Sequence, residues 1–177
     1  MSLRFLTRTA AFALSTVLLC GPAPAQKKDE KADQLGQFGD WGAYKASPGG
    51  KPVCFAFSKP TSAASEPAGR KRDASYAFVS TRPSEKVKNE VSVIVGYPQK
   101  GGMDATVTVG SAHYNFYTQN DGAWVKNAAE EPKMVEAMRK APTMIVKSES
   151  AQGTKTTDTY SLKGFSEALA KVAEACK

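Results

Sequence analysis

The sequence predicts a mainly β fold, largely antiparallel, arranged as a sandwich or barrel and completed by two helices. Short segments alternate apolar and polar residues with a period of two, and turn-forming residues separate them. The strand–helix–strand rhythm of a parallel sheet is missing. The chain of 177 residues has the length of one ordinary domain. Its 41% hydrophobic and 23% charged residues exclude collagen-like, coiled-coil and polytopic membrane proteins.

The N-terminal segment 1–25 has the pattern of a secretory signal peptide. Arg4 and Arg8 precede an apolar run at 10–20, which is too short to cross a hydrocarbon core about 30 Å thick. Small residues then lead to an Ala-x-Ala site that ends at Ala25. We expect an exported protein, and the loss of Arg4 and Arg8 lowers its formal charge from +7 to +5.

Two alternatives to simple cleavage concern the same segment. It could stay as a membrane anchor, or Cys20 could receive a lipid as in bacterial lipoproteins. Lipoprotein processing requires a small residue where Leu19 stands. Cleavage after Ala25 is the preferred interpretation, followed by a polar leader at 26–36, expected to be flexible, and a single domain at 37–177.

Alternation within the domain predicts the strands. In Val53–Ser58, for example, Phe55 and Phe57 share one face and Cys54 lies on the other. Asn120–Gly122 has the composition of a hairpin turn. The expected strands are 38–45, 53–58, 75–81, 90–97, 105–109, 111–118, 123–126, 143–148 and 154–162.

Two segments have helical spacing instead. One is a short helix near 130–140, introduced by a capping-box pattern at 127–130 and ended by Pro142. The other lies near 165–176, where Phe165, Leu169, Val172 and Cys176 recur at intervals of four, three and four residues. Cys176 is therefore expected on the buried side of the last helix.

The mature chain retains two cysteines, Cys54 and Cys176, which we expect to form a disulfide. Export to an oxidising compartment favours pairing, and a bond between them ties the last helix to an early strand. The alternative is a redox-active pair, but such pairs usually stand close together in sequence. We therefore predict a structural disulfide.

Few residues in the sequence suggest catalysis or a cofactor. The single histidine, His113, cannot form a histidine-cluster metal site. Phosphate-binding, EF-hand and HExxH motifs are missing as well. No catalytic, cofactor-binding or metal-binding residue is predicted. A carboxylate-based hydrolase stays open, with candidates that also suit turns, caps and solvent-facing positions: Asp40, Glu90, Asp104 and Asp158.

Arg70, Lys71 and Arg72 form the densest cluster of positive charge, at the end of a small, polar segment expected to be a loop at 59–73. The cluster could contact an anionic partner or the anionic envelope surface, or it could be a solvated loop tip. Three cations without interleaved aromatic residues are a weak nucleic-acid signal, and no nucleic-acid partner is expected. The two tryptophans, Trp41 and Trp124, are expected in the core.

Several short motifs, in this order, resemble the invasion-associated locus B family. They are Phe38–Trp41 before Cys54, Phe78–Pro83, Asn89–Ser92 with Gly96–Tyr97, Ala123–Trp124, Ala137–Met138, and Asp158–Gly164 before the final helix. The resemblance implies an exported bacterial protein with an immunoglobulin-like β-sandwich, linked in some relatives to host-cell entry. It supplies no catalytic residues. Gln152 is a departure, because a basic residue is expected there, and it would weaken binding of an anionic partner.

The sequence thus favours a non-enzymatic envelope protein that binds a protein or glycan partner. It is expected in the periplasm, with outer-membrane association or an extracellular position as alternatives. A periplasmic accessory or assembly factor without a host role is the second hypothesis, and the carboxylate hydrolase is the third. The identity of the partner and the oligomeric state do not follow from the sequence.

Overall fold

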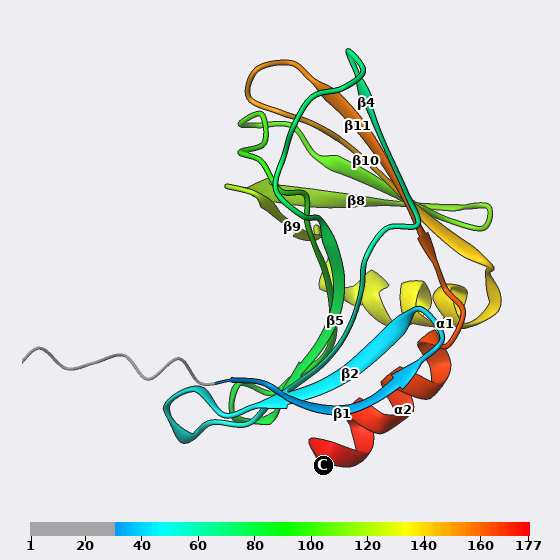
Figure 1. Ribbon diagram of the computed structural model, residues 1–177. Coiled ribbons are helices and arrows are strands. Elements are labelled where there is room, and N and C mark those ends of the chain that lie inside the picture. The colour runs from blue at the N-terminus through cyan, green and yellow to red at the C-terminus, as the bar shows by residue number, and fades with distance from the viewer. Residues whose placement is uncertain (1–30) are drawn as a thin grey trace, which may run out of the picture.

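The computed structural model describes residues 31–177, in which eleven strands form one antiparallel sheet (Figure 1). The predicted signal peptide and its cleavage site lie outside the described residues. The strand order is β1-β2-β3-β5-β6-β9-β8-β7-β10-β11-β4. The strands are β1 (Asp33–Phe38), β2 (Trp41–Ala46), β3 (Val53–Ser58), β4 (Ser62–Glu66), β5 (Tyr76–Arg82), β6 (Val87–Ile94), β7 (Ala105–Val109), β8 (Ala112–Gln119), β9 (Gly122–Val125), β10 (Thr143–Glu149) and β11 (Lys155–Ser161).

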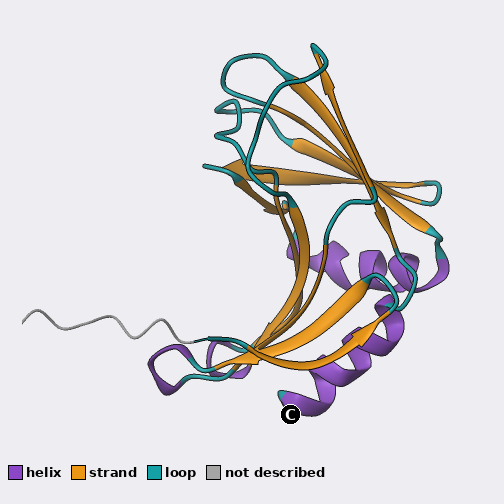
Figure 2. Cartoon of the chain, viewed as in Figure 1, coloured by secondary structure: helices purple, strands orange, loops and turns teal. Residues whose placement is uncertain are grey.

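Both predicted helices are present, and Figure 2 shows them together on one side of the sheet. The 3-10 turn Ala128–Glu130 leads into α1 (Glu131–Lys140), and the Asn127 side chain accepts a hydrogen bond from the Ala129 amide at the start of this turn. Helix α2 (Phe165–Ala175) follows β11 directly. Two further 3-10 turns lie at Pro48–Gly50 and Pro83–Glu85.

The mainly β, antiparallel class with two helices is confirmed. All eleven strands belong to one hydrogen-bonded sheet, so the division into two facing sheets that defines an immunoglobulin-like sandwich stays a prediction. The two distant parts of the sheet nevertheless meet where the Asp40 amide donates to the carbonyl of Lys163, with an N–O distance of 3.0 Å. The sheet therefore curls round a common interior.

Two strands occupy segments that the sequence assigned to other structure. Strand β1 begins at Asp33, so the last four residues of the predicted flexible leader at 26–36 belong to a strand that pairs with β2. Strand β4 lies inside the predicted loop at 59–73 and pairs with β11. Both strands are edge strands with few apolar residues, and backbone pairing to one neighbour holds them without an apolar alternation.

The interior contains the helix-facing side chains of the sheet and the apolar stripes of both helices. Val91 and Val93 of β6 are fully buried, as are Phe165, Ala168 and Val172 of α2. Trp41 is also fully buried, as predicted: its indole lies edge-on to Phe165 with ring centroids 4.9 Å apart, and its Nε1–H donates to the carbonyl of Ser161 at 2.9 Å.

The predicted Cys54–Cys176 disulfide is present and ties the end of α2 to β3. The Cα atoms are 5.9 Å apart, within the usual range for a disulfide. Cys54 is fully buried, and Cys176 is 9% exposed. This covalent link and the apolar stripe of α2 together hold the helix against the core-facing side of the sheet.

No helix among residues 31–177 has the length and apolar character needed to cross a membrane.

Candidate functional site

The face of the sheet opposite the helices carries a cluster of half-buried aromatic rings. It comprises Tyr44 of β2, Phe55 and Phe57 of β3, and Tyr76 and Phe78 of β5, which we call the aromatic face. Alternation places these side chains opposite the buried Ala43, Cys54, Ala56, Ala77 and Val79. In an ordinary two-layer fold the apolar side of a sheet is covered, so an uncovered aromatic side suggests a binding surface.

The rings of the aromatic face contact one another across the strands. Tyr44 and Phe55 are within 12° of parallel with centroids 5.6 Å apart. Phe57 and Phe78 lie directly opposite each other in the β3–β5 register, with centroids 5.7 Å apart. At the edge, the Lys59 ammonium lies 5.8 Å from the centroid of Tyr76, within cation–π range.

A second aromatic pair lies on the same face. The register runs from Phe78 through Ser92 to Trp124 and then to Tyr117, so these four side chains share one row across β5, β6, β9 and β8. Trp124 and Tyr117 are stacked with centroids 5.6 Å apart, and Tyr117 is 44% exposed. The expectation that Trp124 lies in the core is therefore wrong, because its indole is half-buried on the open face.

Two glycines let aromatic rings on this face lie along their strands. A Cβ atom added to Gly42 would lie 2.5 Å from the ring of Tyr44, and one added to Gly122 would lie 2.4 Å from the indole of Trp124. The rings therefore fold back over the glycine two residues earlier instead of projecting from the sheet. Their broad surfaces thus line the open face.

The predicted cationic cluster borders a polar pocket of about 290 Å³, which is separate from the aromatic face. The β4–β5 connection, β11 and the segments beside them supply its lining. This polar pocket is lined by Ser65, Arg70, Lys71, Arg72, Tyr97, Ser150, Gln152, Thr154 and Thr156.

The three cations of the cluster differ in their surroundings. Arg72 forms a bidentate ion pair with the carboxylate of Asp158, which is 1% exposed. Its guanidinium also donates to the carbonyl of Val95 at 3.0 Å. Arg70 and Lys71 are exposed, and among residues 31–177 no carboxylate lies within ion-pair distance of either. Arg72 therefore fixes the pocket wall, while Arg70 and Lys71 carry its available charge.

Hydroxyl groups form much of the rest of the polar pocket. Tyr97 and Thr156 share a hydrogen bond between their hydroxyls, and the Ser150 hydroxyl accepts from the amide of Thr154 at 3.0 Å. The Arg72 guanidinium lies 5.9 Å from the centroid of the Tyr97 ring. The positions of these hydroxyls are thus fixed by the protein itself.

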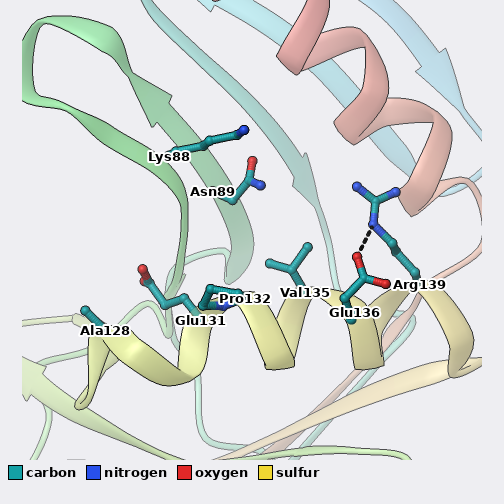
Figure 3. A pocket seen from close by; sticks show the side chains of 8 residues that line it. All are labelled: Lys88, Asn89, Ala128, Glu131, Pro132, Val135, Glu136 and Arg139. Carbon is teal, nitrogen blue, oxygen red and sulfur yellow. Dashed lines mark ion pairs between the residues drawn. The ribbon is translucent and has the colours of Figure 1, made fainter.

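A larger hollow of about 430 Å³ lies between the start of β6 and α1 (Figure 3). Glu131 and Glu136 both line it, but Figure 3 shows them at different points along the helix with Val135 between them. The Glu136 carboxylate faces Arg139, with 3.3 Å between Oε1 and Nε. These two carboxylates do not converge on a common point, as a glycosidase-type site requires.

The four carboxylates proposed for a hydrolase have other surroundings. Glu90 pairs with Arg82, and Asp104 pairs with Lys126, both at 2.8 Å; Asp158 pairs with Arg72. Asp40 is exposed in the β1–β2 turn. Each of the first three thus stabilises a different part of the surface or interior. His113 of β8 is exposed, and its Nδ1 lies 3.0 Å from the Thr108 hydroxyl.

Residues 44–173 match the family described as invasion associated locus B (IalB) protein. The chain belongs to the IalB family. No curated protein and no solved structure matches it.

The IalB match contains both surfaces described above. It begins at Tyr44 in the aromatic face and ends inside α2, so it also includes every residue that lines the polar pocket. Cys176 lies just beyond its end. The resemblance noted from sequence motifs is therefore confirmed, and both candidate surfaces belong to the region that defines membership of the IalB family.

Sequence reasoning missed the aromatic face of this IalB chain as a unit. Alternation predicts that Phe55 and Phe57 share one side of their strand, but it does not show that the helices leave this side of the sheet open. The Gly-x-aromatic spacing at Gly42–Tyr44 and Gly122–Trp124 was an available signal. It marks rings that can lie back along a strand.

Proposed function

We propose that this IalB-family protein is exported and acts as a non-enzymatic binding protein of the cell envelope, with the aromatic face as its partner surface and a glycan as its partner. The uncovered cluster of five aromatic rings on β2, β3 and β5 carries the proposal. Export is supported by the signal-peptide pattern of residues 1–25.

The placement of the rings favours a sugar over a protein segment. Protein interfaces are anchored by aromatic side chains that project into pockets of the partner. Tyr44 instead lies along its strand over Gly42, and its ring is nearly parallel to that of Phe55. Such surfaces suit the C–H faces of pyranose rings, while Ser80, opposite Phe55 in the β3–β5 register, can bond a sugar hydroxyl.

Binding to an oligosaccharide array, followed by fluorescence titration of the best ligand, tests the proposal. The double variant Tyr44→Ser/Phe78→Ser should lose at least about tenfold in affinity, since each change removes a stacking surface. Met103→Ser is the matched control, because Met103 is 43% exposed and lies outside the aromatic face. Equal affinity in the double variant, or no glycan bound, would contradict the proposal. A protein crosslinked in intact cells and lost in the same double variant would replace the glycan with a protein partner.

Export is tested separately by intact-mass measurement of the protein recovered from the producing cells. Cleavage after Ala25 predicts a chain that starts at Gln26. A diacylglycerol-modified N-terminus at Cys20 would instead make the protein lipid-anchored.

A further inference from the structure

The polar pocket lies where the interior-facing side of β11 changes from apolar to polar residues. Tyr160 faces the apolar core and is fully buried, whereas Asp158, Thr156 and Thr154 follow on the same side toward the polar pocket and are 1%, 5% and 7% exposed. Burying polar side chains costs free energy unless they are hydrogen-bonded. Asp158 is bonded to Arg72 and Thr156 to Tyr97, so this end of β11 builds a polar wall that the protein itself holds in place.

Charge is the second observation. Three cations line the polar pocket, Arg70, Lys71 and Arg72, and no carboxylate is among its lining residues. Asp158 lies behind the wall, where both its oxygens accept from Arg72. Arg70 and Lys71 are left without an anionic partner among the described residues. The polar pocket therefore has two uncompensated positive charges beside a set of fixed hydroxyl groups.

The volume of the polar pocket limits the size of the ligand that it can hold. The volume of about 290 Å³ is at the lower end of ligand-binding pockets, which begin near about 300 Å³. A ligand of this size with a negative charge and several hydroxyl groups is a single anionic sugar unit. The charge would meet Arg70 and Lys71, and the hydroxyls would meet Ser65, Tyr97 and Gln152.

We propose that the polar pocket binds one phosphorylated or carboxylated sugar unit, with Arg70 and Lys71 as the anion-binding residues and Arg72 as a positioning residue held by Asp158. This site is distinct from the aromatic face and does not depend on the function proposed for that face. The anionic sugar could be soluble or the headgroup of a glycolipid, since the recognised chemistry is the same.

Calorimetric titration of the exported protein with glucose 1-phosphate and glucuronate, against neutral glucose, tests the proposal. At least one anionic sugar should bind measurably and glucose should not. Arg70→Gln and Lys71→Gln should each weaken binding about tenfold, because each removes one charge-assisted contact. Lys51→Gln, an exposed lysine outside the polar pocket, is the matched control and should bind like the wild type. Equal binding of glucose, or unchanged binding in both pocket variants, would overturn the proposal.

A gain-of-function variant keeps the test independent of folding. Gln152 is exposed at the pocket, so Gln152→Lys adds a third available cation and should tighten binding of the anionic sugar without creating affinity for glucose. No change in Gln152→Lys would count against the site.

Vesicles distinguish the sources of the ligand. Vesicles with a phosphorylated glycolipid should retain the protein and release it when glucose 1-phosphate is added, if the headgroup is recognised. The site is supported if glucose 1-phosphate releases the protein from the glycolipid vesicles and if vesicles of plain anionic phospholipid do not retain the protein. Equal retention on both kinds of vesicle, insensitive to glucose 1-phosphate, would show general charge attraction and overturn the proposal.

Discussion

Arg70 and Arg72 stand two residues apart in the same connection, yet their surroundings give them different roles. The Arg72 guanidinium neutralises Asp158, whose carboxylate is almost completely buried. Arg72→Gln leaves that carboxylate without its cation, so the free energy of unfolding should fall by about 3–5 kcal/mol. Arg70→Gln changes an exposed side chain and should stay within about 0.5 kcal/mol of the wild type. Urea unfolding of both variants measures the difference, and equal losses would contradict these roles.

Replacing both partners of the buried pair separates its charge from its shape. Arg72→Met/Asp158→Leu removes both charges together, so no buried charge is left unpaired. We expect this double variant to recover most of the stability that Arg72→Gln loses. A double variant as unstable as the single one would show that packing, not charge, makes Arg72 important.

Glu131 gives a prediction for the pH dependence of stability. Burial raises the pKa of its carboxyl above the ordinary value of 4.5, although the amide of Val91 donates to this side chain and opposes the rise. The folded protein thus keeps a proton that the unfolded chain has already released. Glu131 therefore stabilises the folded protein fully at a pH below 4.5, the ordinary pKa of the group. This contribution to the free energy of unfolding is lost as the pH rises through the folded-state pKa.

The variant Glu131→Gln removes this titration and keeps the oxygen that accepts from Val91. Relative to the wild type, it should gain stability between about pH 4 and neutral pH. Glu136→Gln, on the same helix but 62% exposed at its side chain, is the control and should show no such gain. Urea unfolding at both pH values measures the change. A Glu131→Gln variant that loses stability relative to the wild type as the pH rises would contradict the burial argument.

At the scale of elements, the strands predicted from the sequence are those with one apolar side against the core. Strands β3, β5 and β7 alternate buried and partly exposed residues along their whole length, and period-two reasoning found them. Strand β4 has the sequence Ser-Ala-Ala-Ser-Glu, with no such alternation, and only its pairing with β11 makes it a strand. Local sequence does not contain that pairing.

The disulfide acts on α2, whose apolar stripe already holds it on the sheet. Cys54→Ala/Cys176→Ala should lower the free energy of unfolding by about 2–5 kcal/mol, mainly because the unfolded chain regains the freedom that the link removes across 122 residues. Phe165 and Leu169 stay buried, so the folded variant should keep native fluorescence from Trp41. Denaturant unfolding with far-UV dichroism measures the loss. A variant that loses its last helix without denaturant would mean that the apolar stripe is insufficient.

Strand β9 offers a test of the glycine beneath the indole. Gly122→Ala places a Cβ where the Trp124 ring now lies, and the ring, being the end of a side chain, can swing away. We expect a folded variant with altered tryptophan fluorescence and weaker glycan binding. Gly101→Ala is the control, because an added Cβ there meets no atom within 4 Å. Unchanged fluorescence and binding in Gly122→Ala would contradict the placement of the ring.

At the scale of the whole molecule, the sheet has one side that builds the core and another that is open in its aromatic half. The sequence predicted the class of fold from local alternation, and the disulfide from the two cysteines that lie beyond the predicted signal peptide, Cys54 and Cys176. It named the cationic cluster Arg70, Lys71 and Arg72, but neither the pocket that this cluster lines nor the aromatic face. The Arg72–Asp158 pair joins residues 86 positions apart, and the aromatic face depends on which side the helices cover. Such information belongs to the assembled sheet.

The two tryptophans report on these two sides. Trp41 closes the interior, with its indole against Phe165 and its N–H bonded to Ser161, so Trp41→Ala should cost about 3–5 kcal/mol of unfolding free energy. Trp124 is half-buried beside Tyr117 on the open face, so Trp124→Ala removes less buried surface and should cost clearly less. Denaturant unfolding measures the loss of stability in both alanine variants. Glycan titration measures binding: Trp124→Ala should weaken it. Trp41→Phe, which keeps an aromatic ring in the core, should leave glycan binding unchanged. If Trp41→Phe impaired binding while Trp124→Ala did not, the assignment of one side to stability and the other to recognition would be wrong.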